Sequence, residues 1–189
     1  MLDQPKVDMT LSLHLWNDKP LGWVHVAKGP VMAGAEHFRI KLIGKGGHGA
    51  QPHLCVDALE VGTQVVAALQ RVVSRQTNPI EPAVVTVGTF HAGTAFNIIS
   101  AEAVLSGTTR TVNEETWKSW KARIDQVVNG VCASMGAGYE LTFTPGYPPT
   151  VNDARMADVV RRCAVQVVGD ERVVEPERTM GGEDMSFFL

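Results

Sequence analysis

The sequence predicts an α+β fold for residues 35–145, with strands and helices in the order βαββαβ. Three observations support this prediction: strand-like runs that alternate or are rich in β-branched residues, two long apolar stripes at helical spacing, and glycine- or proline-containing turns between them. The order is that of the split βαβ, ferredoxin-like arrangement. Because each crossover is long enough to be a helix, we expect helices on one face of the sheet and a free opposite face.

The first half of this unit begins with an alternating strand over residues 36–43, in which Phe38, Ile40 and Leu42 share one face. A glycine-rich loop, residues 44–49, interrupts the pattern. Asp57 then opens a helix with an acid-x-x-Glu capping pattern, and apolar residues recur at helical spacing until residue 75. The β-branched run 83–90 predicts the second strand.

The second half begins with a strand over residues 101–111. Asn113 is a favourable N-cap, and Glu114 and Glu115 place negative charge in the first helical turn. An apolar stripe follows as far as Val131, glycines end the helix, and residues 139–144 predict the last strand.

The flanking segments, residues 1–34 and 146–189, are too short to form cores of their own. The first has strand character at 7–15 and 22–27. The second offers a helix at 154–168, a short strand near 172–174 and the opening of a helix at 186–189. We therefore expect two partial pieces of a second domain, 1–34 and 146–189, around a central domain at 35–145, with the remainder of that second domain outside these residues.

The composition excludes several classes of protein. The 189 residues are 44% hydrophobic with a formal net charge of -3, which argues against disorder and against nucleic-acid or anionic-membrane binding by bulk charge. No apolar run is long enough to span a membrane, and the first residues show no secretory signal pattern. The odd number of widely spaced cysteines fits a reducing compartment, so we expect a cytoplasmic protein.

The residues that could carry chemistry are ambiguous when taken singly. None of the six histidines forms a close metal-ligand pair on a helix, and a single strand histidine is more often a hydrogen-bond partner than a ligand. The run GKGGHG matches neither the P-loop nor the dinucleotide fingerprint. Glu183 and Asp184 follow two glycines, where helix capping is the simplest interpretation.

Five linked motifs together are more specific. The runs GKGGHGAQPHLCVDAL, VVTVGTFHAGTAFNIIS, GTTRT, GYPPTVND and TMGGEDMSFFL occur in this order over nearly the whole chain. In this the chain resembles the hippurate hydrolase and N-acyl-amino-acid amidohydrolase group of the co-catalytic zinc aminoacylase and carboxypeptidase family. The resemblance implies an α/β zinc-hydrolase catalytic domain, here incomplete, into which residues 35–145 are inserted as a ferredoxin-like lid, or dimerisation, domain.

The resemblance also implies site residues. His14 matches a metal ligand, and His48 matches a lid histidine that reaches the partner subunit's active site and stabilises the developing oxyanion. Asn97 and Arg110 match residues that hold the substrate's backbone and carboxylate, and Gly182 and Glu183 lie in a turn beside the substrate pocket. These roles fit the chemistry, because guanidinium binds carboxylate bidentately and an imidazole N–H can stabilise a carbonyl oxygen. We expect His48, Asn97 and Arg110 to converge on one rim that faces a neighbouring molecule's cleft.

The implied activity is metal-dependent hydrolysis of an N-acyl amino acid to a carboxylic acid and an amino acid, with two divalent metal ions, zinc or manganese, in the complete enzyme. The sequence departs from this pattern because no Glu-Glu pair precedes His14 and no histidine follows His91. We therefore expect these 189 residues to bind no metal and to be inactive alone, while forming a homodimer through the lid. The alternative is a non-catalytic dimerisation or small-ligand-binding module, which ferredoxin-like units often form.

Overall fold

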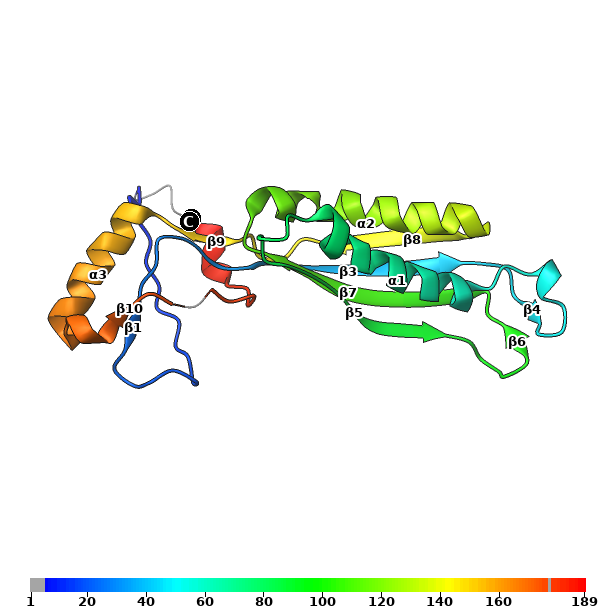
Figure 1. Ribbon diagram of the computed structural model, residues 1–189, viewed down its shortest axis with the longest axis horizontal. Coiled ribbons are helices and arrows are strands. Elements are labelled where there is room, and N and C mark those ends of the chain that lie inside the picture. The colour runs from blue at the N-terminus through cyan, green and yellow to red at the C-terminus, as the bar shows by residue number, and fades with distance from the viewer. Residues whose placement is uncertain (1–5, 177) are drawn as a thin grey trace.

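The computed structural model describes residues 6–176 and 178–189; residues 1–5 and Glu177, which belong to the predicted flanking segments, lie outside the described residues. The molecule is elongated and has two lobes (Figure 1). We call residues 34–144 the sheet lobe, and the described residues before 34 and after 144 the terminal lobe.

The sheet lobe contains the predicted βαββαβ series. In chain order its main elements are β3 (Gly34–Ile43), α1 (Ala58–Gln76), β5 (Ala83–Ala92), β7 (Glu102–Thr111), α2 (Glu114–Met135) and β8 (Gly138–Thr144). The strands form one sheet in the order β5-β7-β3-β8, and all neighbours are antiparallel. The predicted order of these elements is confirmed.

The local signals in the sequence act as expected. The side chain of Asp57 accepts hydrogen bonds from the backbone N–H groups of Leu59 and Glu60, and that of Asn113 accepts from Thr116. These bonds satisfy N–H groups that have no partner inside the helix. Helix α2 ends at Gly136, whose φ of 71° is the left-handed conformation that favours glycine.

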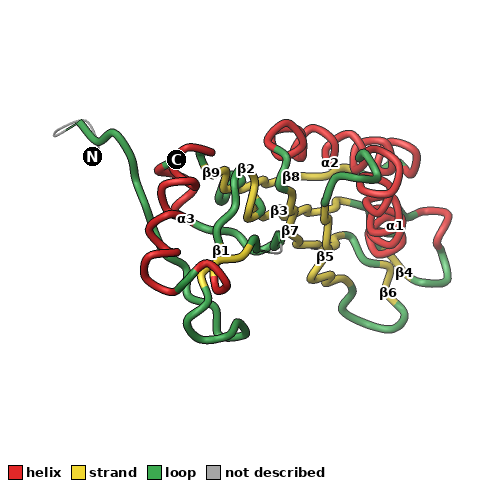
Figure 2. Tube along the Cα trace, turned by 60° about the vertical axis from the view of Figure 1, so that its left-hand side comes forward, coloured by secondary structure: helices red, strands yellow, loops and turns green. Residues whose placement is uncertain are grey.

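The core lies between the two helices and one face of the sheet. Its fully buried side chains include Phe38, Ile40, Leu69, Leu105 and Trp120. Burying one such aliphatic or aromatic side chain contributes roughly 1.5–3 kcal/mol. Both helices lie on the same side of the sheet (Figures 1 and 2), so the expectation of one covered and one free face is confirmed.

The free face of the sheet is polar. Rows of cross-strand neighbours carry hydroxyl and basic side chains there, namely Thr86, Thr108, His37 and Thr144 in one row and Thr89, Ser106, Arg39 and Thr142 in the next. Most of these side chains are exposed. A sheet with one solvated face has the inward apolar and outward polar alternation that residues 36–43 show in the sequence.

A small ribbon extends from the sheet lobe at the end farther from the terminal lobe. It consists of β4 (Gly47–His48) and β6 (Ile98–Ile99), which pair in an antiparallel manner, and the short 3-10 helix η1 (Pro52–Leu54). We call residues 46–54 and 93–99 the tip (Figure 1). The sequence predicts only a loop and a turn here, because two-residue strands leave no periodicity to detect.

The terminal lobe holds short elements. In chain order these are β1 (Val24–His25), β2 (Gly29–Met32), β9 (Thr150–Asn152), α3 (Ala154–Val168), η2 (Asp170–Arg172), β10 (Val173–Val174) and η3 (Asp184–Phe188). Strand β1 pairs with β10 in parallel, and β2 pairs with β9 in an antiparallel manner. Helix α3 has its predicted bounds, and the predicted opening of a helix at 186–189 is a short 3-10 helix that begins two residues earlier, at Asp184, and ends at Phe188.

The prediction of a strand over residues 7–15 is also wrong. The segment is extended but unpaired, and its alternating side chains Leu11, Leu13 and Leu15 are 61%, 77% and 91% exposed. A strand requires a hydrogen-bonded neighbour, and the described residues provide none along this segment. The predicted strand over 22–27 is reduced to the two residues of β1. No helix in the described part of the chain has the length and apolar character needed to cross a membrane.

Candidate active site

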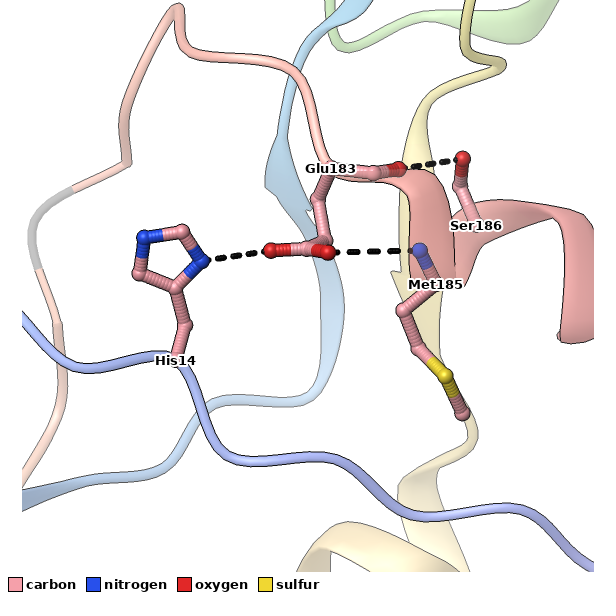
Figure 3. Close-up of polar contacts among 4 residues, drawn as sticks. All are labelled: His14, Glu183, Met185 and Ser186. Carbon is pink, nitrogen blue, oxygen red and sulfur yellow. Dashed lines mark hydrogen bonds and ion pairs between the residues drawn. The ribbon is translucent and has the colours of Figure 1, made fainter.

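His14 and Glu183 meet in the terminal lobe, although 169 positions separate them in the sequence. His14 Nδ1 lies 2.5 Å from Glu183 Oε2 (Figure 3). The second carboxylate oxygen of Glu183 accepts a hydrogen bond from the backbone N–H of Met185, and its carbonyl accepts from the hydroxyl of Ser186. The hydrogen bond from His14 is the largest cause that holds the pKa of Glu183 below its ordinary value. The capping role expected for Glu183 therefore coexists with a contact to the predicted metal ligand.

A metal site requires more donors than this pair supplies. A catalytic zinc ion takes three protein ligands and keeps one open position. Within residues 6–176 and 178–189, no group of three or more His, Cys, Asp and Glu side chains is placed to hold a metal ion. One imidazole and one carboxylate that already bond to each other do not fit a metal ion by themselves.

The turn before Glu183 packs against the start of β3. The backbone N–H of Ala33 donates to the carbonyl of Gly181 at 2.9 Å. A Cβ atom on Gly182 would lie 2.9 Å from a ring carbon of Tyr147 and 3.1 Å from the Cβ of Ala35. Gly182 is therefore the residue that allows this turn, and with it Glu183, to lie against the sheet lobe.

His48 and Asn97 meet at the tip. His48 pairs with Ile98, and the N–H of Gly49 donates to the carbonyl of Asn97 at 2.8 Å. His48 Nδ1 accepts a hydrogen bond from the backbone N–H of Ala50 at 3.1 Å, so the proton of the neutral ring lies on Nε2. His48 is exposed, and its Nε2–H is therefore accessible to solvent as a hydrogen-bond donor.

Arg110 lies at the opposite end of the sheet. It is the second-last residue of β7 and pairs with Ala35 and Val84, on the free face. Arg110 is eight residue steps along β7 from Glu102, which is near the tip, and these steps span roughly 27 Å. The expectation that His48, Asn97 and Arg110 converge on one rim of one molecule is wrong. The chain brings His48 to Asn97, and it places Arg110 near the terminal lobe that holds His14 and Glu183.

The central part of the chain matches a known family. Residues 33–136 match the peptidase dimerisation domain, M20_dimer, which is more than half of the chain. The chain belongs to the M20 peptidase dimerisation-domain family. Its match begins one residue before β3 and ends at the residue that terminates α2.

Relatives of this M20 chain are longer proteins. YhaA of Bacillus subtilis (strain 168) is 42% identical over 182 residues, which are 96% of this chain and 46% of YhaA. The N-acyl-L-amino acid amidohydrolase of Geobacillus stearothermophilus is 42% identical over 146 residues, 77% of this chain and 40% of that enzyme. The M20 chain therefore spans about half the length of these curated relatives.

A solved structure shares the fold of the M20 chain. The YXEP protein of Bacillus subtilis, described as a dinuclear metal binding peptidase of the M20 family, superposes with a TM-score of 0.74 at 27% identity. The superposition covers 93% of this chain and 43% of YXEP.

One polar residue of the M20 chain escapes prediction from the sequence. Glu36 is only 8% exposed and lies on the helix-covered side of β3, where its Oε2 accepts a hydrogen bond from Thr109 Oγ1 at 3.2 Å. Burial raises the pKa of Glu36 to about 7. The sequence contained the information needed to predict this burial. Side chains of a strand alternate between its two faces, and Glu36 precedes Phe38, Ile40 and Leu42 at intervals of two residues, so it shares their buried face.

Proposed function

We propose that this chain is the ferredoxin-like lid, residues 35–145, and two partial catalytic-domain segments, 1–34 and 146–189, of a metal-dependent amidohydrolase that acts on N-acyl amino acids. The observation that carries the proposal is the division of the candidate residues between the two ends of the molecule. His48 and Asn97 lie at the tip, and Arg110, His14 and Glu183 lie at or near the terminal lobe.

This division favours an active site shared between two subunits. The tip of one molecule cannot reach the terminal lobe of the same molecule while the sheet of the lid separates them (Figure 1). A second copy arranged about a two-fold axis can place its tip there, and a two-fold pair forms two such sites. We therefore propose that each site takes Arg110, His14 and Glu183 from one subunit and His48 and Asn97 from its partner.

The proposed chemistry adds water across the amide bond, so that the acyl carbon gains OH and the leaving nitrogen gains H. The Nε2–H of His48 donates to the carbonyl oxygen as negative charge develops on it, and the Asn97 side chain holds the substrate backbone. The guanidinium of Arg110 takes the free carboxylate of the amino-acid part with a bidentate pair of hydrogen bonds. These contacts orient the amide and stabilise charge in the transition state.

The cofactors we propose are two divalent ions, zinc or manganese, with His14 as one ligand and Gly182 and Glu183 beside the bound substrate. The described residues supply no further ligand set, so the other donors and the proton-transferring base must come from polypeptide outside them. We infer that the 189 residues alone are inactive. The three cysteines, none in a disulfide, support a reducing compartment, the cytoplasm.

A chimera tests this proposal. Residues 35–145 replace the matching segment of the Geobacillus stearothermophilus amidohydrolase, and release of amino acid from N-acyl-L-amino acids is measured. We expect activity in the chimera and a loss of about 100- to 1000-fold in kcat for His48→Ala, the size of loss seen when one oxyanion donor is removed. Gln126→Ala, at an exposed position in the middle of α2, is the matched control.

Mixing two inactive variants tests the shared site. If His48 and Arg110 serve one site from different subunits, then a mixture of His48→Ala and Arg110→Ala chimeras, unfolded and refolded together, regains activity, because mixed dimers hold one intact site. Refolded single variants stay inactive. Absence of recovery in a mixture shown to form mixed dimers would contradict the division of the site between subunits.

A further inference from the structure

The two lobes are joined by a small set of backbone contacts, which we call the joint: residues 33–36, 145–147 and 181–183. The N–H of Ala33 donates to Gly181 at 2.9 Å, and the N–H of Ala35 donates to Tyr147 at 2.8 Å. A Cβ atom on Gly146 would lie 2.0 Å from the carbonyl oxygen of Ala35, so the loop after β8 meets the start of β3 closely here. Displacement at the joint would move Glu183, and with it the His14 contact, relative to the lid.

A buried carboxyl group lies within the joint. Glu36 is 8% exposed, and within the described residues it has one hydrogen-bond partner for its side chain, the Thr109 hydroxyl at 3.2 Å. A buried carboxylate is stable only when several donors or a cation compensate its lost hydration. One hydroxyl at this distance is far from sufficient, and burial is accordingly the larger influence on the pKa of Glu36, which it raises to about 7.

Among the described residues, no Lys, Arg or His side chain forms an ion pair with Glu36. Strand β3 and helix α2 both start where β7 ends, and they run in the same direction. Trp117 contacts Gly34 at the start of β3. Trp120 is about one helical turn farther along α2, which places it near the level of Glu36. The indole N–H groups of both tryptophans are buried and have no hydrogen-bond partner in the part of the chain that the structure describes. Of the titratable groups at this end of the sheet lobe, Glu81 accepts a hydrogen bond from Thr116 of α2, and the guanidinium of Arg123 donates to Gln76 and Thr77. The His14–Glu183 pair lies across the joint, in the terminal lobe.

We propose that Glu36 is a positioning residue whose proton keeps the joint closed: neutral Glu36 fits the buried layer, and ionised Glu36 opens the contacts of Ala33 and Ala35 with the terminal lobe. The direction of opening follows from packing. Toward the tip, the next two residues of β3 on the helix-covered face are Phe38 and Ile40, which are fully buried. In the other direction β3 begins at Gly34, two residues before Glu36, where the joint lies. Water that solvates the carboxylate therefore enters through the joint.

The consequence for catalysis rests on the proposed function, because it assumes that Gly182 and Glu183 border the substrate. The proton-dependent joint itself does not rest on it. Above the pKa of Glu36 the lid would be free to change its angle to the terminal lobe, and below it the two would be held as one body. The joint can therefore be tested on this chain without any enzymatic assay.

Hydrogen exchange of the joint amides gives the test. Protection factors of the Ala33 and Ala35 amides are measured between pH 5 and pH 8, with Ile40 in the middle of β3 as the internal reference. If opening restores an ordinary pKa to Glu36, protection at the joint falls about tenfold between pH 6 and pH 8, while Ile40 is unaffected. Glu36→Gln, which is neutral at every pH, abolishes this dependence.

Two further variants keep the test decisive. Thr109→Val removes the one hydroxyl partner and retains Glu36, so the midpoint of the change in protection moves to higher pH. Glu140→Gln, at an exposed position of β8 in the same sheet, behaves as the unmodified chain. An unchanged pH dependence in Glu36→Gln, or an unmoved midpoint in Thr109→Val, overturns the proposal. If Glu36→Gln does not fold, the Thr109→Val result decides. If the chimera is active but protection at the joint does not depend on pH, this inference alone is rejected. If protection at the joint depends on pH but the chimera is inactive, the proposed function alone is rejected.

Discussion

The carboxyl group of Glu36 makes the global stability of the chain depend on pH with an unusual sign. Its pKa is about 7 in the folded chain and 4.5 ordinarily, so between these values the folded chain holds a proton that the unfolded chain has lost. The free energy of unfolding therefore falls as pH rises through this window, by about 3 kcal/mol when pH 7 is passed. Glu183 and Asp153, whose pKa values are lowered, act in the opposite direction at lower pH.

The Glu36 contribution is isolated by difference. Urea unfolding from pH 5 to pH 8 is compared for the unmodified chain and Glu36→Gln, since the other carboxyl groups are common to both. We expect the stability of the variant relative to the unmodified chain to increase from pH 5 to about pH 7 and to level off above it. A difference that does not vary with pH would show that Glu36 ionises at the same pH in the folded and unfolded chains.

At the scale of the helices, two glycines provide a matched pair. A Cβ atom on Gly130 in α2 would meet open space, whereas a Cβ on Gly62 in α1 would lie 2.4 Å from Cζ of Phe90. Gly130→Ala should stabilise the chain by about 1 kcal/mol, because alanine is the better helix former. Gly62→Ala gains the same propensity but overpacks the core, so we expect net destabilisation of about 1–2 kcal/mol. Urea midpoints measure both, and equal effects would contradict the close packing of Gly62 on Phe90.

Elements whose signals are local could be predicted from the sequence, and those defined by distant partners could not. Asp57, Asn113 and Asp153 cap the helices they precede, and the bounds of α3 agree with the prediction. Residues 7–15 alternate as a strand should, yet without a neighbouring strand they form none. In the candidate site the motifs named His14 and Glu183, but their contact across 169 residues, and the separation of Arg110 from the tip, required the topology.

For the whole molecule, the incomplete donor set predicts weak metal binding. Equilibrium dialysis of the chain with zinc should show no tight stoichiometric site, because His14 and Glu183 supply fewer ligands than a protein zinc site uses. His14→Ala should leave the binding curve almost unchanged. A measured ratio of one or two tightly bound ions per chain would mean that the described residues rearrange into a site that this conformation does not show.

The shared site also predicts that the chain associates through its lid. Sedimentation equilibrium should give twice the chain mass of 20.4 kDa at micromolar concentration, because the sheet has two edges, β5 and β8, whose outer backbone groups can pair with a second copy. Lysine at an exposed edge-strand position opposes such pairing, because its charge is costly to desolvate against an added strand. Thr89→Lys on β5 and Thr142→Lys on β8 are therefore each other's control, and the variant that weakens the dimer identifies the edge.

The exposed leucines of residues 11–15 offer a competing route of association, which Leu13→Ser removes without touching the lid. A chain that remains monomeric, or a dimer that only Leu13→Ser disrupts, would leave the tip with no partner site to enter.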